Sequence, residues 1–181
     1  AWEVGSSPND PDCVMATKMT FQNASGTTFT LDVTRHVRLL EANDLRDLFG
    51  EAAGKAASTR GVKMVGYETL NQITNVGPPW ARQTGLASIW ILGMFNAGPK
   101  TIVIVPYKSG SDAELGPVAN SDCPLPLVAN RSAVLSQAVL LRADGACRWA
   151  MGASPKCVRN VMGSIDFDLG MLTLIRFSMP P

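Results

Sequence analysis

The chain has 181 residues, enough for one domain that buries roughly 70% of the surface its unfolded form would expose. Its hydrophobic fraction is 46% and its charged fraction is 17%, below the usual value of about 25%, so an extra buried surface such as an oligomer interface is expected. With 16 basic and 15 acidic residues the net charge is +1 and neither sign forms a run, which excludes nucleic acid and anionic lipid as expected partners.

The first predicted elements form a β-hairpin. Residues 1–13 are irregular, residues 13–22 alternate as a strand, and Asn23-Ala24-Ser25-Gly26 supplies a turn into a second strand over residues 27–40. On this second strand one face is apolar and the other is polar. The apolar face carries Leu31, Val33, Val37 and Leu39, and the polar face carries Thr30, Asp32, Thr34, His36 and Arg38.

One short helix is predicted next. Apolar residues recur at helical spacing from Leu45 to Ala56, and Asn43 or Asp44 is the expected N-cap. Gly50 and Gly54 weaken this helix. A strand is then expected over residues 62–77, ending at the breaker Gly77-Pro78-Pro79.

Two apolar runs, at residues 86–95 and 101–107, are separated by Asn96-Ala97-Gly98-Pro99. Both fall well short of the ~20 residues that a membrane-spanning helix needs, so no membrane partner is expected. Apolar runs of this length that are bounded by turn residues are typical of strands covered on both faces. The prediction for residues 86–95 is therefore an interior strand, covered by its own chain or by a second copy.

The rest of the chain is predicted to hold a long loop and two hairpins. Residues 108–133 are rich in Gly, Pro, Ser, Asn and Asp, and loops of that length often border a site. The hairpins are expected to join residues 138–142 to 147–151 through Asp144-Gly145, and residues 161–167 to 171–177 through Gly170. About nine strands and one short helix, without strand–helix alternation, predict an all-β antiparallel β-sandwich over a single domain, residues 1–181.

Several chemistries lack their sequence signatures. The chain has one histidine and no GxSxG elbow, and it has no glycine-rich phosphate-binding motif. Its four cysteines form no CxxC pair, so no metal or cofactor is predicted, and they are free thiols or a bridge such as Cys147 to Cys157. No basic and apolar leader precedes Trp2, so no signal peptide is expected in this chain.

The candidate catalytic groups are two carboxylates and the histidine. Glu68 lies in a mostly uncharged strand, where burial would raise its pKa for acid or base work, and Asp166 could be its partner if the fold brings the two within about 5 to 10 Å. His36 could be an acid or base that faces a sugar. The structural alternatives are a Glu68 paired with an arginine and a His36 that is a solvated or hydrogen-bonded face residue. Asp144 could also be the second carboxylate, but it is assigned to a turn.

Two tryptophans could stack on sugar rings. Trp90 is assigned to core packing because its run is expected to be buried, and Trp80 is left open between the two roles.

Four stretches together resemble a known family. They are TFQNASGTTFTLDVTRHVRLL, VKMVGYETLNQITNVG, TGLASIWILGMFNAGPKTIVIVPYK and LLRADGACRWAMGASPKCVRNVMGSIDF. The chain resembles the central part of an uncharacterised family of exported bacterial proteins, for which a galactose-mutarotase-like supersandwich and a link to carbohydrates are expected. Family members are about twice as long, so this chain could be a truncated sandwich. The resemblance implies export to the periplasm or the extracellular space.

Together the residues and the resemblance give two main functional hypotheses, besides an enzyme of unknown reaction type whose site is assembled across an oligomer interface. The first is an epimerase-like enzyme or glycoside hydrolase that acts through Glu68, Asp166 and His36. The second is a non-catalytic carbohydrate-binding or structural β-sandwich. The expected substrate-binding residues are Asn71, Asn75, Trp80, Arg148 and Lys156. Bare sheet edges or an apolar face would pair with other chains, which predicts a homo-oligomer.

Overall fold

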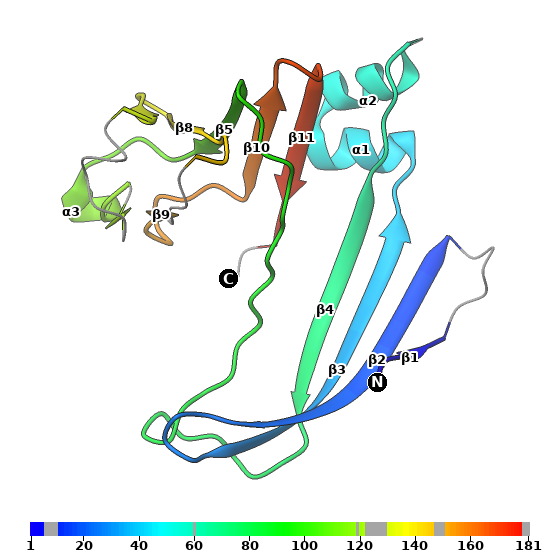
Figure 1. Ribbon diagram of the computed structural model, residues 1–181, viewed down its shortest axis with the longest axis vertical. Coiled ribbons are helices and arrows are strands. Elements are labelled where there is room, and N and C mark those ends of the chain that lie inside the picture. Colours follow the sequence, from blue (N-terminus) through cyan, green and yellow to red (C-terminus); the bar gives the residue numbers. More distant parts are fainter. Residues whose placement is uncertain (6–10, 60, 119, 122–129, 147–150, 179–181) are drawn as a thin grey trace. The chain divides into compact units, whose positions relative to one another are not determined.

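The computed structural model describes residues 1–5, 11–59, 61–118, 120–121, 130–146 and 151–178. The chain divides into two compact units, Ala1–Leu92 and Gly93–Pro181. Each unit carries one open antiparallel sheet (Figure 1). The mostly-β, antiparallel prediction is confirmed, and two open sheets of this kind are the components of a sandwich. The prediction of a single domain stays a prediction.

The first unit holds a four-stranded sheet, here the first sheet, in the order β1-β2-β3-β4. Its long strands β2, β3 and β4 run side by side (Figure 1). The bounds are β1 Glu3–Val4, β2 Asp12–Gln22, β3 Thr28–Leu39 and β4 Tyr67–Asn75. The predicted first hairpin is therefore confirmed, whereas the strand expected from residue 62 begins at Tyr67.

The β2–β3 turn depends on the side chain of Asn23. Its Oδ1 accepts hydrogen bonds from the backbone N–H groups of Ser25 and Thr27 at 3.0 and 2.9 Å. Gly26 takes a φ of 82°, which glycine adopts without steric cost. This turn fixes the register, in which Leu31 faces Met19 and Val33 faces Thr17.

The register confirms the two faces predicted for β3. Because side chains alternate along a strand, Leu31, Val33 and Val37 lie on one side, here the apolar face. The other side, here the polar face, carries His36 and Arg38.

The predicted single helix is in fact two short helices. Helix α1 spans Ala42–Phe49 and α2 spans Glu51–Ser58, separated by Gly50 at a φ of 88°. The N-cap is Glu41, not Asn43 or Asp44. The Asp44 side chain instead accepts a hydrogen bond from the Glu41 N–H at 2.9 Å, which satisfies a donor at the helix start. A third helix, α3, spans Asp112–Leu115 inside the expected long loop. No helix in the described part of the chain is long and apolar enough to cross a membrane.

The second unit holds a five-stranded sheet, here the second sheet, in the order β11-β10-β5-β8-β7. Its strands are β5 Thr101–Pro106, β7 Ser132–Val134, β8 Ala138–Arg142, β10 Val161–Asp166 and β11 Met171–Arg176. A separate pair joins β6 Asn120–Ser121 to β9 Met151–Gly152. The core of this unit is Tyr107, Val139 and Leu141, with Val103 and Val105 packed against them.

One of the two predicted C-terminal hairpins forms. Strands β10 and β11 pair as expected around the turn at Gly170. The hairpin from residues 138–142 to 147–151 is wrong in its described part, because β8 pairs with β5 and β7 while β9 pairs with β6. Residues 147–150 lie outside the described residues. Pairing with the distant β5 and with the adjacent β7 thus took the place of the hairpin that Asp144-Gly145 favours.

The interior strand predicted at residues 86–95 is wrong. This segment forms no strand, and Trp90 is 83% exposed and Leu92 64% exposed. From residue 86 to residue 97 the backbone forms no hydrogen bond with another described residue. The run has the composition of a buried strand, but no described strand pairs with it on either side.

Candidate functional site

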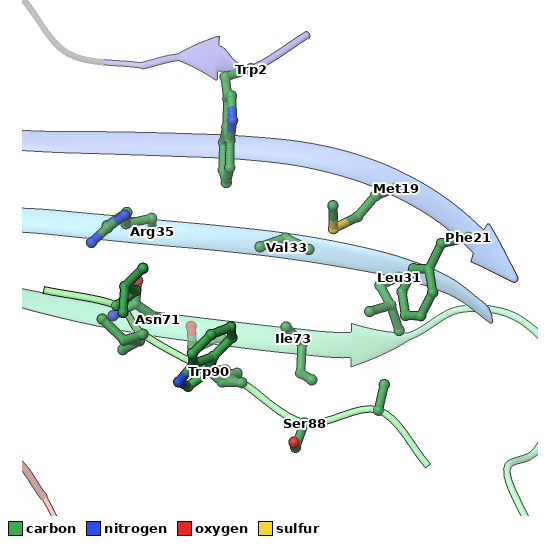
Figure 2. A pocket seen from close by; sticks show the side chains of 15 residues that line it. Trp2, Met19, Phe21, Leu31, Val33, Arg35, Asn71, Ile73, Ser88 and Trp90 are labelled. Atoms are coloured by element: carbon green, nitrogen blue, oxygen red, sulfur yellow. The ribbon is translucent and has the colours of Figure 1, made fainter. Parts of the chain in front are cut away.

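A groove of about 330 Å³ lies within the first unit, between the apolar face of the first sheet and the extended segment at residues 87–92 (Figure 2). The sheet side of the groove comes from the alternation of β2, β3 and β4, which sends every second side chain to this face. Apolar residues make up most of it: Met19, Phe21, Leu31, Val33 and Ile73. Concave, mostly apolar surfaces with a few polar groups are typical of ligand sites.

Two tryptophans border this groove. Trp2 is 50% exposed and Trp90 is 83% exposed, and both belong to the groove lining (Figure 2). Their rings are therefore open to solvent and available to a ligand. The sequence assigned Trp90 to the core because its run was expected to be a buried strand. Its position in an unpaired segment overturns that assignment.

The polar side chains of the groove centre on Arg35 and Asn71. These residues face each other directly across β3 and β4, so their side chains lie on the same face as neighbours. The Asn71 amide donates a hydrogen bond to Thr69 Oγ1 at 3.1 Å. Asn71 is the one predicted substrate-binding residue that lines the groove, and its role stays a prediction.

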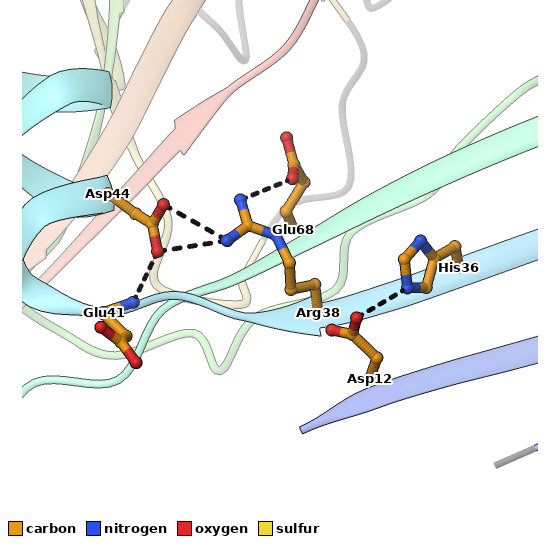
Figure 3. A network of polar contacts seen from close by, with 6 residues as sticks. All are labelled: Asp12, His36, Arg38, Glu41, Asp44 and Glu68. Carbon is orange, nitrogen blue, oxygen red and sulfur yellow. Dashed lines mark hydrogen bonds and ion pairs between the residues drawn. The ribbon is translucent and has the colours of Figure 1, made fainter. Parts of the chain in front are cut away.

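Glu68 belongs to a network on the polar face of the first sheet (Figure 3). Arg38 donates to Glu68 Oε2 at 3.1 Å and to both oxygens of Asp44 at 3.2 Å. The hydrogen bond to Glu68 is the main cause that raises the pKa of Arg38. The hydrogen bond from the Glu41 N–H is the main cause that lowers the pKa of Asp44, followed by the bond from Arg38. Glu68 thus has the arginine partner that the structural alternative expects, while its catalytic role stays a prediction, and the network ties β3, β4 and α1 together.

His36 lies on the same polar face. Its Nε2 is 3.4 Å from Asp12 Oδ2, and both side chains are more than a third exposed (Figure 3). His36 is thus a partly exposed face residue beside Asp12, and its role as an acid or base stays a prediction. His36 and Glu68 share the polar face of the first sheet, whereas the groove lies on its apolar face.

Asp166 ends β10 in the second unit and is buried, with 5% of its surface exposed. Its carboxylate accepts hydrogen bonds from the N–H groups of Asp168 and Leu169 at 2.9 and 3.0 Å and from Thr101 Oγ1 at 3.0 Å. The bond from the Leu169 N–H is the main cause that lowers the pKa of Asp166. A carboxylate held in the ionised form in this way connects β10 to β5 and shapes the following turn.

Three other predicted residues have structural contacts. Asn75 Oδ1 accepts from the Gly77 N–H at 3.0 Å, in a turn after β4. Trp80 is partly buried and packs edge-on against Phe29, with ring centroids 5.6 Å apart. The Lys156 backbone N–H donates to Ser154 Oγ at 3.3 Å. Their proposed roles toward a sugar stay predictions, and Arg148 lies outside the described residues.

Asp144 has the turn role assigned to it. Its carboxylate accepts from the Ala146 N–H at 3.0 Å and pairs with Arg131 and Arg142. Cys157 is a free, fully buried thiol, which removes the suggested bridge to Cys147, and Cys13 is also free. Cys123 and Cys147 lie outside the described residues.

Sequence reasoning missed Arg35, Trp2 and Trp90 as groove residues. A signal for Arg35 was available, because it interrupts the apolar alternation between Val33 and Val37. A charged residue at an apolar position of a strand indicates a special role for that residue. No comparable signal exists for Trp2 or Trp90, because their exposure depends on which segments the sheet leaves unpaired.

The fold and the groove define a mostly-β protein with two open antiparallel sheets and an aromatic-lined groove on the first. The chain belongs to DUF6786, a family of unknown function, whose model matches residues 1–181. No curated protein and no solved structure matches the chain.

Proposed function

We propose that the chain is a non-catalytic carbohydrate-binding module whose groove holds the sugar. The observation that carries this proposal is the pair of solvent-open tryptophans, Trp2 and Trp90, beside the polar pair Arg35 and Asn71. The negative face of an aromatic ring attracts the partly positive C–H groups on one face of a pyranose. The polar side chains then have hydroxyl groups within reach. In small-molecule sites, apolar and aromatic side chains likewise form most of the contact surface, while a few polar groups fix the orientation of the ligand.

The positions of the carboxylates favour binding over catalysis. Glycoside hydrolysis needs two carboxyl groups flanking the scissile bond, and the described groove lining includes no Asp or Glu. Glu68 is bound to Arg38, and Asp166 forms three hydrogen bonds in a turn of the other unit. Both carboxylates therefore have structural contacts that explain their positions without a reaction.

The choice of sugar as the ligand class also draws on the family resemblance. The galactose-mutarotase-like supersandwich, the link to carbohydrates and the export expected from that resemblance are part of this proposal. The membership in DUF6786 supports the resemblance at the level of a family of unknown function.

The test is direct binding of oligosaccharides, measured by a glycan screen and then by calorimetry or NMR titration. Trp90→Ala should weaken binding about tenfold, because an aromatic contact of about 1 to 1.5 kcal/mol corresponds to that factor. Phe167→Ala is the matched control, since Phe167 is also an exposed aromatic residue, 62% exposed, but does not line the groove.

Two results would contradict the proposal. If no sugar binds, or if Phe167→Ala weakens binding as much as Trp90→Ala does, the groove is not a sugar site. Turnover of a chromogenic glycoside or anomer exchange that Glu68→Gln abolishes would favour the enzyme hypothesis instead.

The open edge of the second sheet favours a homo-oligomer as a second proposal. Strand β11 pairs with β10 on one side, and no other described strand pairs with it. Met171, Leu172 and Leu174 on this six-residue strand are 43 to 60% exposed. An apolar edge strand is a template for pairing with another chain. A second copy can meet this edge with its own β11, which gives a closed two-fold pair.

Light scattering tests the oligomer. We expect a dimer at micromolar concentration that Leu172→Lys converts to a monomer, because a charge on the edge opposes pairing. Leu169→Lys is the control, since Leu169 is 67% exposed but lies in the turn before β11. A wild-type monomer at micromolar concentration would overturn the proposal.

A further inference from the structure

Arg35 is a groove cation that has no ion-pair partner among the described residues. It is the one charged residue in the described lining, and its side chain is half-buried. Its Nε is buried and has no hydrogen-bond partner among the described residues. No ion pair joins Arg35 to a described carboxylate.

Two other arginines of the chain have carboxylate partners. Arg38, three residues further along β3, pairs with Glu68 and Asp44 at 3.1 and 3.2 Å. Arg142 of the second unit pairs with Asp144 at 3.1 Å. A partly desolvated cation without a counterion costs free energy, and an anionic ligand would recover it.

Asn71 adds a complementary acceptor beside Arg35. The two residues are direct partners across β3 and β4. The side-chain NH₂ group of Asn71 donates hydrogen bonds to Thr69. The side-chain carbonyl oxygen of Asn71 accepts no hydrogen bond from a described residue. A guanidinium donor and an amide acceptor side by side match a ligand that has a carboxylate next to a hydroxyl group.

A carboxylate suits this site better than a more highly charged anion. The planar guanidinium fork matches the two oxygens of one carboxylate. A single arginine, in a groove whose lining also includes Leu31, Val33, Ile73 and Trp90, supplies one positive charge in a mostly apolar groove. One charge balances a singly charged carboxylate and leaves a doubly charged phosphate undercompensated.

We propose that the groove is selective for acidic sugars, with a uronate carboxylate on Arg35, a neighbouring hydroxyl group on the Asn71 carbonyl oxygen, and the pyranose ring against Trp90. This inference deepens the proposed carbohydrate-binding function and rests on it. The ligand class it names is an oligosaccharide of uronic acids.

The experiment compares two sugars that differ in charge. Calorimetric titrations would use a galacturonic acid trisaccharide and the galactose trisaccharide with the same linkages. The wild-type chain should bind the acidic trisaccharide at least tenfold more tightly, and added salt should reduce this preference. Arg35→Met should bind both sugars with equal affinity, and Arg35→Lys should retain part of the preference because it keeps the charge but not the fork.

Arg82→Met is the matched control, because Arg82 is an exposed arginine outside the groove lining, and it should keep the full preference. Thermal unfolding of each variant checks that the fold is retained. If Arg35→Met does not fold, the comparison of Arg35→Lys with the wild type provides the same test, and an unchanged preference would overturn the inference.

The outcomes distinguish a failure of the acidic-sugar inference from a failure of the proposed carbohydrate-binding function. Equal binding of the two trisaccharides by the wild type, or a preference that Arg35→Met leaves intact, overturns the acidic-sugar inference while sugar binding stands. Binding of neither trisaccharide overturns the acidic-sugar inference, and a glycan screen in which no sugar binds overturns the carbohydrate-binding function as well. Binding of benzoate, a carboxylate without a sugar, as tightly as the acidic trisaccharide also overturns the choice of an acidic sugar.

Discussion

The apolar runs at residues 86–95 and 101–107 have nearly the same character in sequence but take different structures. The second contains β5, which pairs with β10 on one side and β8 on the other. The first forms no strand and borders the groove with Trp90 largely exposed. The comparison teaches that apolar composition marks a segment that burial would stabilise, whereas flanking strands decide whether it becomes an interior strand.

A proline substitution in each run should give the largest difference in the free energy of unfolding between the two regions. Ile104→Pro should lower the free energy of unfolding by about 3 kcal/mol or more, because it removes a ladder hydrogen bond inside a paired strand. Ile91→Pro should change it by less than about 0.5 kcal/mol, because the backbone there has no described hydrogen bond to lose. Urea denaturation followed by circular dichroism measures both. Equal losses would mean that residues 86–95 are paired as a strand in solution.

Truncating one buried and one exposed leucine to alanine should give the next largest difference in the free energy of unfolding. Leu141 on β8 is 3% exposed in the core of the second unit, and Leu92 is 64% exposed. Leu141→Ala should cost about 2 to 4 kcal/mol through lost burial and a residual cavity. Leu92→Ala should stay within about 0.5 kcal/mol of the wild type. The same denaturation experiment measures this pair, and a costly Leu92→Ala would show that the exposed run is buried in solution.

Substituting Asp166 should give a smaller difference in stability, and one that depends on pH. Asp166 joins the end of β10 to Thr101 at the start of β5, a connection that residues 86–95 lack among the described contacts. Because its folded-state pKa is lowered, Asp166 contributes stability that is present above its unfolded pKa of about 3.9 and is lost as the pH falls through the folded pKa.

The measurement for Asp166 is the melting temperature of the wild type and of Asp166→Asn from pH 7 to pH 2. The variant should melt at a lower temperature at pH 7, and the gap should narrow in the acid range as the wild type loses its carboxylate. A gap that stays constant from pH 7 to pH 2 would show that the hydrogen bonds of Asp166 do not depend on its charge.

The sequence by itself determined several local features of this protein. The alternation of residues 27–40 predicted both faces of β3, and Asn23 with Gly26 predicted the turn before it. The pairing of β10 with β11 likewise followed from a turn and two short apolar strands. These features are readable because hydrophobic period and turn chemistry act over a few neighbouring residues.

Only the tertiary structure decided the features that make the candidate site. It left residues 86–95 unpaired, placed β8 between β5 and β7, and put Arg35 in an apolar groove without a described counterion. These outcomes depend largely on segments that are distant in sequence, such as β5, which pairs with β8. A strand's partner and a side chain's counterion are properties of long-range pairing, which the local pattern of residues does not specify.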